Sequence, residues 1–183
     1  MTNYVYIATS LDGFIATRDG SIDWLYEITN PSHSDYGYAE FMSGIDAIVM
    51  GRNTFEKVLS FGEWVYDKPV FILSNSLTEL PQDIADKATI VRVEINKLIE
   101  QLNFQGYKNI YIDGGQTIQS FLKEDLIDEM IITVVPIILG DGFPLFGKLD
   151  KKLDFKHEKT EIYHQNLVKS HYLRDRYKQQ SQS

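Results

Sequence analysis

Residues 45–54 read Ile45-Asp46-Ala47-Ile48-Val49-Met50-Gly51-Arg52-Asn53-Thr54, an apolar run that stops abruptly at a glycine. A short apolar, β-branched run of this length bounded by a turn residue is typical of a buried strand. Asn53 or Thr54 is expected to cap a following helix, whose inner face carries Phe55, Val58 and Leu59. The segment therefore predicts a strand–turn–helix unit of an α/β protein.

The same alternation of strands and helices extends on both sides of this unit. Upstream, we expect a strand over 4–9, its resumption over 14–16, a surface loop over 24–34 and a short helix beginning near Asp35. Downstream, we expect strands over 69–73, 88–93, 109–112 and 130–135, the last one central in the sheet, and helices over 96–104 and 116–123. Residues 153–163 and 167–173 predict a closing antiparallel pair.

This element order predicts an α/β fold, a three-layer sandwich with a mixed, mainly parallel sheet and an antiparallel C-terminal hairpin. The sequence shows no internal repeat, linker or shift in composition. We therefore expect a single domain over residues 1–173 and a polar, flexible tail over 174–183.

Composition excludes several classes of protein. The net charge of −8 argues against a general nucleic-acid binder, which needs excess Lys and Arg. The chain has no cysteine, and no apolar run approaches the length of a membrane span. Its four histidines lack ligand spacing, so we expect no metal site. The chain opens without a basic leader, and we expect a cytoplasmic location.

Three of the predicted strands end in turns suited to a dinucleotide. The first turn is Met50-Gly51-Arg52-Asn53-Thr54, the second Leu73-Ser74-Asn75-Ser76 and the third Asp113-Gly114-Gly115-Gln116-Thr117. Ligands of open α/β sheets bind at the carboxyl ends of strands, and helix N-termini bind phosphates. Each turn alone also fits an ordinary loop, and no Gly-x-Gly-x-x-Gly fingerprint follows the first strand. Together they indicate a bound dinucleotide.

The chain resembles the dihydrofolate reductase superfamily over about residues 4–173. The resemblance lies in residues 5–16, in Asp23-Trp24-Leu25, in residues 46–54, in Asp113-Gly114-Gly115, and in residues 126–129 and 136–146. Within this superfamily the chain is most similar to the reductase domain of bacterial bifunctional riboflavin-biosynthesis deaminase-reductases. The resemblance implies an NADPH-dependent reductase of a small pterin- or ribosylaminopyrimidine-like substrate.

The resemblance also implies cofactor contacts that coincide with the three turns. Ala8 and Ile15 are expected beside the nicotinamide, while Arg52, Ser74 and Asn75 surround the 2′-phosphate of NADPH. Neighbouring cofactor positions are Gly51, Asn53, Thr54 and Leu73, and the pyrophosphate is expected against Gly114, Gly115, Gln116 and Thr117.

The expected chemistry rests on three residues. By family position, Asp35 is the acid that orients the substrate ring, bonded to Thr133, and Trp24 lies near the nicotinamide. Asp35 also reads as an ordinary helix N-cap, and Trp24 as a loop aromatic that covers the core. The three residues are therefore catalytic candidates with structural alternatives.

Differences between this chain and the family narrow the expected range of substrates. The chain has neither the deaminase domain nor a clear basic residue for a folate tail, so dihydrofolate is disfavoured as substrate. The alternative function is a non-catalytic NADPH-binding or sensor protein that retains the fold. The resemblance further implies a homodimer, paired through the strand at 130–135 and the loop at 139–146.

Overall fold

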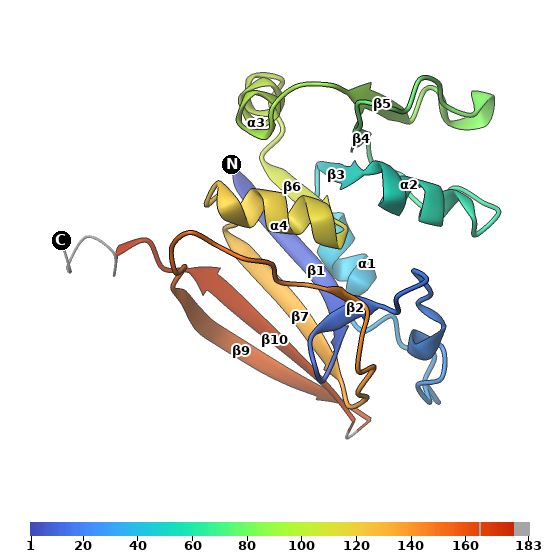
Figure 1. Ribbon diagram of the computed structural model, residues 1–183, viewed down its shortest axis with the longest axis vertical. Coiled ribbons are helices and arrows are strands. Elements are labelled where there is room, and N and C mark those ends of the chain that lie inside the picture. Colours follow the sequence, from blue (N-terminus) through green and yellow to red (C-terminus); the bar gives the residue numbers. More distant parts are fainter. Residues whose placement is uncertain (165, 178–183) are drawn as a thin grey trace.

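The apolar run at residues 45–54 forms strand β3 (Ala47–Gly51), inside an eight-stranded sheet (Figure 1). The computed structural model describes residues 1–164 and 166–177. From edge to edge the sheet contains β5 (Ala88–Val91), β4 (Val70–Leu73), β3, β6 (Asn109–Asp113), β1 (Thr2–Ser10), β7 (Glu129–Val135), β10 (Leu167–Arg174) and β9 (Phe155–Tyr163). A separate ribbon pairs β2 (Phe14–Ala16) with β8 (Phe143–Pro144).

Helices cover both faces of the parallel part of the sheet, which gives the expected three layers. They are α1 (Tyr38–Ser43), α2 (Arg52–Leu59), α3 (Ile95–Phe104) and α4 (Gly115–Lys123). A hydrophobic core lies on each face of the sheet, and alternate residues of β3 point into one or the other. Val49 packs with α3 and α4, whereas Ile48 and Met50 pack with α1 and α2. We call these the α3/α4 face and the α1/α2 face.

Strand β7 marks the change of direction in the sheet. It runs parallel to β1 and antiparallel to β10, and β10 pairs with β9 in the predicted hairpin. The fold class is therefore confirmed. The expectation of a central position for residues 130–135 is inaccurate, because two further strands lie on one side of β7 and five on the other. An antiparallel hairpin can extend a parallel sheet without a crossover helix.

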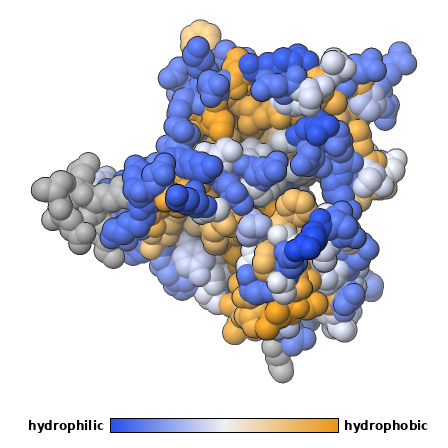
Figure 2. Space-filling view, in the orientation of Figure 1, coloured by the Kyte–Doolittle hydropathy of each residue, from blue (hydrophilic) through white to orange (hydrophobic). Residues whose placement is uncertain are grey.

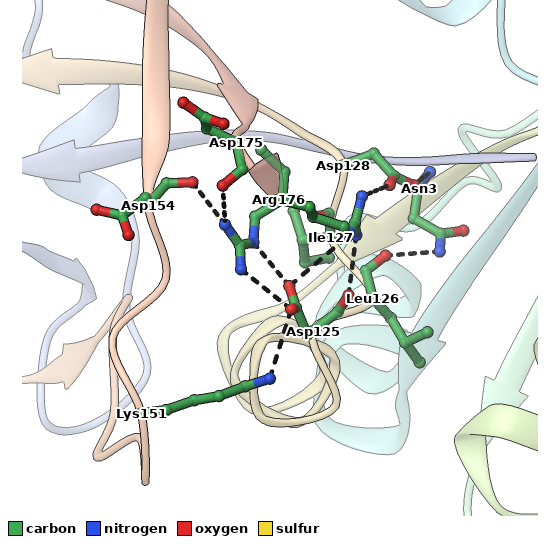
Figure 3. Close-up of polar contacts among 10 residues, drawn as sticks. Asn3, Asp125, Leu126, Ile127, Asp128, Lys151, Asp154, Asp175 and Arg176 are labelled. Atoms are coloured by element: carbon green, nitrogen blue, oxygen red, sulfur yellow. Dashed lines mark hydrogen bonds and ion pairs between the residues drawn. The ribbon is translucent and has the colours of Figure 1, made fainter. Parts of the chain in front are cut away.

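The C-terminal strand is longer than expected, because Arg174 belongs to it. A polar network that includes Asp125, Lys151 and Arg176 lies beside the end of this strand (Figure 3). The Arg174 side chain is 1% exposed and donates to both carboxylate oxygens of Asp125, at 2.7 and 3.0 Å. Arg176 donates to Asp128 at 2.7 Å, and Lys151 lies 3.6 Å from Asp125. The start of the predicted tail is therefore anchored, and residues 178–183 lie outside the described residues.

Within the described part of the chain, every helix is too short or too polar to cross a membrane. The same residues contain no group of three or more His, Cys, Asp or Glu side chains arranged to hold a metal ion.

Candidate cofactor and substrate site

The connections of β3 and β6 diverge at the carboxyl edge of the sheet. These strands are parallel neighbours, but α2 leaves β3 towards the α1/α2 face and α4 leaves β6 towards the α3/α4 face. Helices that diverge from adjacent strands leave a topological switch point, where α/β proteins bind ligands. Two of the three turns singled out in the sequence meet here.

Glycines allow the two turns to approach each other closely. Gly114 has φ +89°, and a Cβ atom at this position would clash with Oγ1 of Thr54 in α2. A Cβ atom at Gly51 would lie 3.0 Å from Oγ1 of Thr117 in α4. A Cβ atom at Gly115 would lie 2.6 Å from Cδ1 of Ile15 in β2. We call Gly51, Gly114 and Gly115 the glycine cradle.

Backbone amides point from the helix N-termini at this cradle. The N-caps are Gly51 for α2 and Gly114 for α4, and among the described residues neither helix has a side-chain cap. The expectation that Asn53 or Thr54 caps α2 is therefore wrong, because the helix already begins at Arg52. Uncapped first-turn amides and the positive end of the helix dipole together attract anions.

The adenosine end of the predicted cofactor site is polar and exposed. The side chain of Arg52 lies 3.4 Å from that of Glu56 on the same helix, and Asn53, Asn75 and Gln116 are exposed. The oxygen of Ser74, directly after Leu73 of β4, accepts from the amide of Leu77 at 2.9 Å. Arg92, which follows β5, donates to the carbonyl of Leu77 at 2.5 Å.

The predicted nicotinamide residues are divided between the two faces: Ala8 lies with Trp24 farther along the sheet, whereas Ile15 packs against the core of the α3/α4 face. Ala8 of β1 pairs with Thr133 of β7. Trp24 is 4% exposed and packs in a cluster that includes Val135 and Ala8. Its indole Nε1 is buried and, among the described residues, has no hydrogen-bond partner. Trp24 therefore covers core, as the structural alternative expects, and its position near the nicotinamide stays a prediction.

Asp35 does not match its predicted role. It is exposed, and its two carboxylate oxygens accept from the amides of Gly37 at 2.9 Å and Ala39 at 2.8 Å. These bonds lower its pKa, because they favour the ionised carboxylate. The expectation of a buried carboxyl bonded to Thr133 is therefore wrong. Asp35 is not the N-cap of α1 either, because Gly37 holds that position, although its carboxylate binds the amide of Ala39 in the first turn.

Asp113 is a second acidic residue of this region, which the sequence analysis named only as part of the third turn. It is the last residue of β6, directly before the glycine cradle, and its Oδ2 accepts from the hydroxyl of Tyr66 at 3.1 Å. Tyr6, Tyr38, Tyr66 and Tyr111 gather around it on the α1/α2 face, and we call them the tyrosine cluster. Burial raises the pKa of the Asp113 carboxyl, although bonds from Tyr66 and Tyr111 oppose this shift.

The fold defines a protein of the dihydrofolate-reductase-like class. The model of the RibD C-terminal domain matches residues 4–169. The chain is 38% identical over 174 residues to the uncharacterised Bacillus subtilis protein YwjB, covering 93% of this chain and 96% of that protein. The chain therefore belongs to the RibD C-terminal domain family.

Solved structures agree with this assignment. A candidate riboflavin biosynthesis protein from Shewanella sp. PV-4 superposes with a TM-score of 0.93 at 51% identity, over 96% of this chain and 100% of that one. The Thermotoga maritima diaminohydroxyphosphoribosylaminopyrimidine deaminase/5-amino-6-(5-phosphoribosylamino)uracil reductase superposes with a TM-score of 0.72. That match, at 15% identity, covers 95% of this chain and 56% of the longer one, and it supports the fold alone.

Proposed function

We propose that the protein is an NADPH-dependent reductase of a small ring compound of pterin or pyrimidine type. The observation that carries this proposal is the glycine cradle at the switch point of the sheet, where a side chain on Gly114 would clash with Thr54. These glycines let the uncapped N-termini of α2 and α4 pack close together, and backbone amides that converge in this way suit a pyrophosphate. Gly51, Gly114, Gly115 and Thr117 would hold it, and Arg52 would face the 2′-phosphate.

The bound cofactor would supply a hydride to a C=N or C=O carbon of the substrate. The neighbouring nitrogen or oxygen then takes one proton, which gives the reduced product and NADP⁺. Asp113 suits the role of proton donor, because burial favours its neutral form and the residue adjoins the cradle. Ala8 and Thr133 would form the floor under the reacting ring.

Hydride transfer is tested by following NADPH oxidation with purified protein and a series of pterin, pyrimidine and quinone acceptors. Enzyme-dependent oxidation with at least one ring acceptor supports the proposal. Saturable NADPH binding without oxidation by any acceptor favours the alternative of a non-catalytic NADPH-binding protein.

We further propose that the protein is a cytoplasmic homodimer. On the α3/α4 face, Val134, Val168 and Ile162 lie in register on β7, β10 and β9, and Ile162 is 67% exposed. A cavity of about 410 Å³, lined by Val134, Phe146 and Tyr172 among others, opens on this face. Figure 2 shows apolar residues gathered over its lower part. Exposed apolar patches of this kind mark protein interfaces.

Light scattering tests the dimer. The wild type is expected at twice the chain mass, and Val168→Glu at the chain mass. Phe104→Glu is the matched control, because Phe104 is an exposed apolar residue of α3 outside this patch. A monomeric wild type would contradict the proposal.

A further inference from the structure

A row of four residues crosses the sheet beside the proposed substrate position. Ala8 pairs with Thr133, Thr133 with Lys169, and Lys169 with Glu161, on β1, β7, β10 and β9. Side chains of directly paired residues point to the same face of a sheet. Lys169 is therefore the cation that this row brings closest to Thr133, and its free donors decide whether an anionic group can bind there.

All three donors of the Lys169 ammonium group are engaged. Its Nζ lies 2.6 Å from Oε2 of Glu161, 2.8 Å from the hydroxyl of Tyr163 and 2.9 Å from the carbonyl of Tyr36. The side chain is only 11% exposed. An ammonium group has three N–H donors, so this one has none left for a phosphate oxygen.

The surrounding carboxylates also oppose the binding of a phosphate group in this region. Glu161 is held ionised, because its bond from Lys169 lowers its pKa, and it also lies 3.7 Å from Lys159. Asp35 is likewise held ionised and lies next to Tyr36 in the chain. A phosphate group brought into this region would meet both carboxylates without a free cation from Lys169. Like charges brought together at a binding surface oppose binding.

Aromatic side chains pack on the same side of the sheet as this row. The ring centroids of Tyr6 and Phe41 lie 4.7 Å apart, and those of Tyr6 and Tyr38 lie 5.6 Å apart. The buried indole N–H of Trp24, which lacks a partner among the described residues, is a donor that a ligand acceptor would satisfy. Aromatic rings beside single polar groups suit planar heterocycles.

From these contacts we infer that the substrate is a planar ring compound that carries no phosphate group. The inference rests on the proposed reductase function and narrows its substrate class. It separates this chain from the reaction named for the Thermotoga maritima relative, whose substrate is a phosphoribosylamino compound.

A matched pair of ligands tests the inference. 5-Amino-6-ribosylaminouracil and its 5′-phosphate are titrated by calorimetry into the full chain, with and without NADP⁺, and pterin serves as a second uncharged ring. At least one uncharged ring is expected to bind, and the uncharged uracil compound about tenfold or more tighter than its phosphate. Equal or tighter binding of the phosphate overturns the inference, as does failure of both uncharged rings to bind.

A charge-neutralising variant then tests whether the Lys169–Glu161 pair causes the difference in affinity between the uncharged uracil compound and its 5′-phosphate. Glu161→Gln removes the carboxylate that holds the Lys169 ammonium group. We expect the affinity ratio between the uncharged uracil compound and its 5′-phosphate to fall several-fold, because the phosphate compound binds more tightly to this variant. Glu158→Gln is the matched control, with the same charge change at an exposed position of the same strand, and keeps the wild-type ratio. An unchanged ratio in Glu161→Gln contradicts the role given to the pair.

NADPH is titrated into the same samples, so that two failures can be told apart. Absence of NADPH binding contradicts the proposed function. A preference for the phosphate compound in the presence of bound cofactor contradicts the substrate inference alone.

Discussion

The hydroxyl of Tyr66 donates a hydrogen bond of 3.1 Å to Oδ2 of Asp113 and so joins the loop after α2 to the last residue of β6. Burial raises the pKa of both groups. The contact fixes an acid of raised pKa directly before Gly114 of the glycine cradle. A carboxyl group in such a position is suited to give up a proton close to a bound cofactor.

Replacing Asp113 by Asn is expected to lower kcat by about 10²–10⁴-fold, which is the usual contribution of a general acid. The affinity for NADPH is expected to stay unchanged, because the amide preserves the size of the side chain. Steady-state oxidation of NADPH and a separate binding titration measure the two effects. The matched control is Asp35→Asn, which should retain turnover because Asp35 is exposed and the amide oxygen of Asn can still accept a hydrogen bond from the backbone amides that Asp35 binds. The opposite ranking of the two variants would restore Asp35 as the acid.

The pH dependence of kcat provides a second test of Asp113. A proton donor acts in its neutral form, so kcat should fall as pH rises through the raised pKa of this carboxyl. The bond from Tyr66 favours the ionised form and lowers that pKa. Tyr66→Phe removes this bond and should move the descending limb of the profile to higher pH. A limb that stays in place, or moves to lower pH, would show that Tyr66 does not act on this group.

Gly114→Ala tests the glycine cradle. An L-residue at φ +89° is strained by about 1–2 kcal/mol, and the added methyl group would also clash with Thr54. We expect a lower free energy of unfolding together with the loss of NADPH binding. Gly106→Ala is the matched control, because its φ is +96° but no described atom lies within 4 Å of the added Cβ position. It should show the backbone strain alone, with normal NADPH binding.

Arg174 and Asp125 give a stability prediction. Burial alone would raise the pKa of Asp125, but the bonds and charge of Arg174 bring it below its ordinary value of 3.8. A carboxyl whose pKa is depressed in the folded state stabilises the protein above its unfolded pKa, and this contribution is lost as pH falls through the folded pKa. Arg174→Ala should therefore cost about 3–5 kcal/mol at neutral pH. Urea denaturation should find a smaller cost below pH 3.8, and an equal cost at both pH values would contradict the linkage.

The sequence predicted the parts of the fold that depend on local pattern. The apolar run before Gly51 and the β-branched runs elsewhere correspond to the observed strands, and the three polar turns lie at strand ends. Two of these turns approach each other because β3 and β6 are adjacent in the sheet. The order of elements along the chain does not by itself determine that these two strands are neighbours.

Asp35 lies outside its expected buried position because that expectation depended on counting through an irregular loop. Residues 24–37 have no periodic pattern, and both His33 and Tyr36 adopt positive φ angles of 49° and 56°. The contact between Tyr66 and Asp113 spans 47 residues and comes from a loop without a regular pattern. The sequence feature that could have pointed to Asp113 as a candidate is an acidic residue directly before Gly114-Gly115 at the end of a buried strand.

One measurement tests the central claim most directly: titration of NADPH into the purified full chain, followed by energy transfer from the buried Trp24 to the nicotinamide. We predict saturable quenching with a micromolar dissociation constant, weaker binding of NADH, and loss of the signal in Gly114→Ala. The absence of saturable binding below about 1 mM, the weak end of specific affinity, would contradict the account.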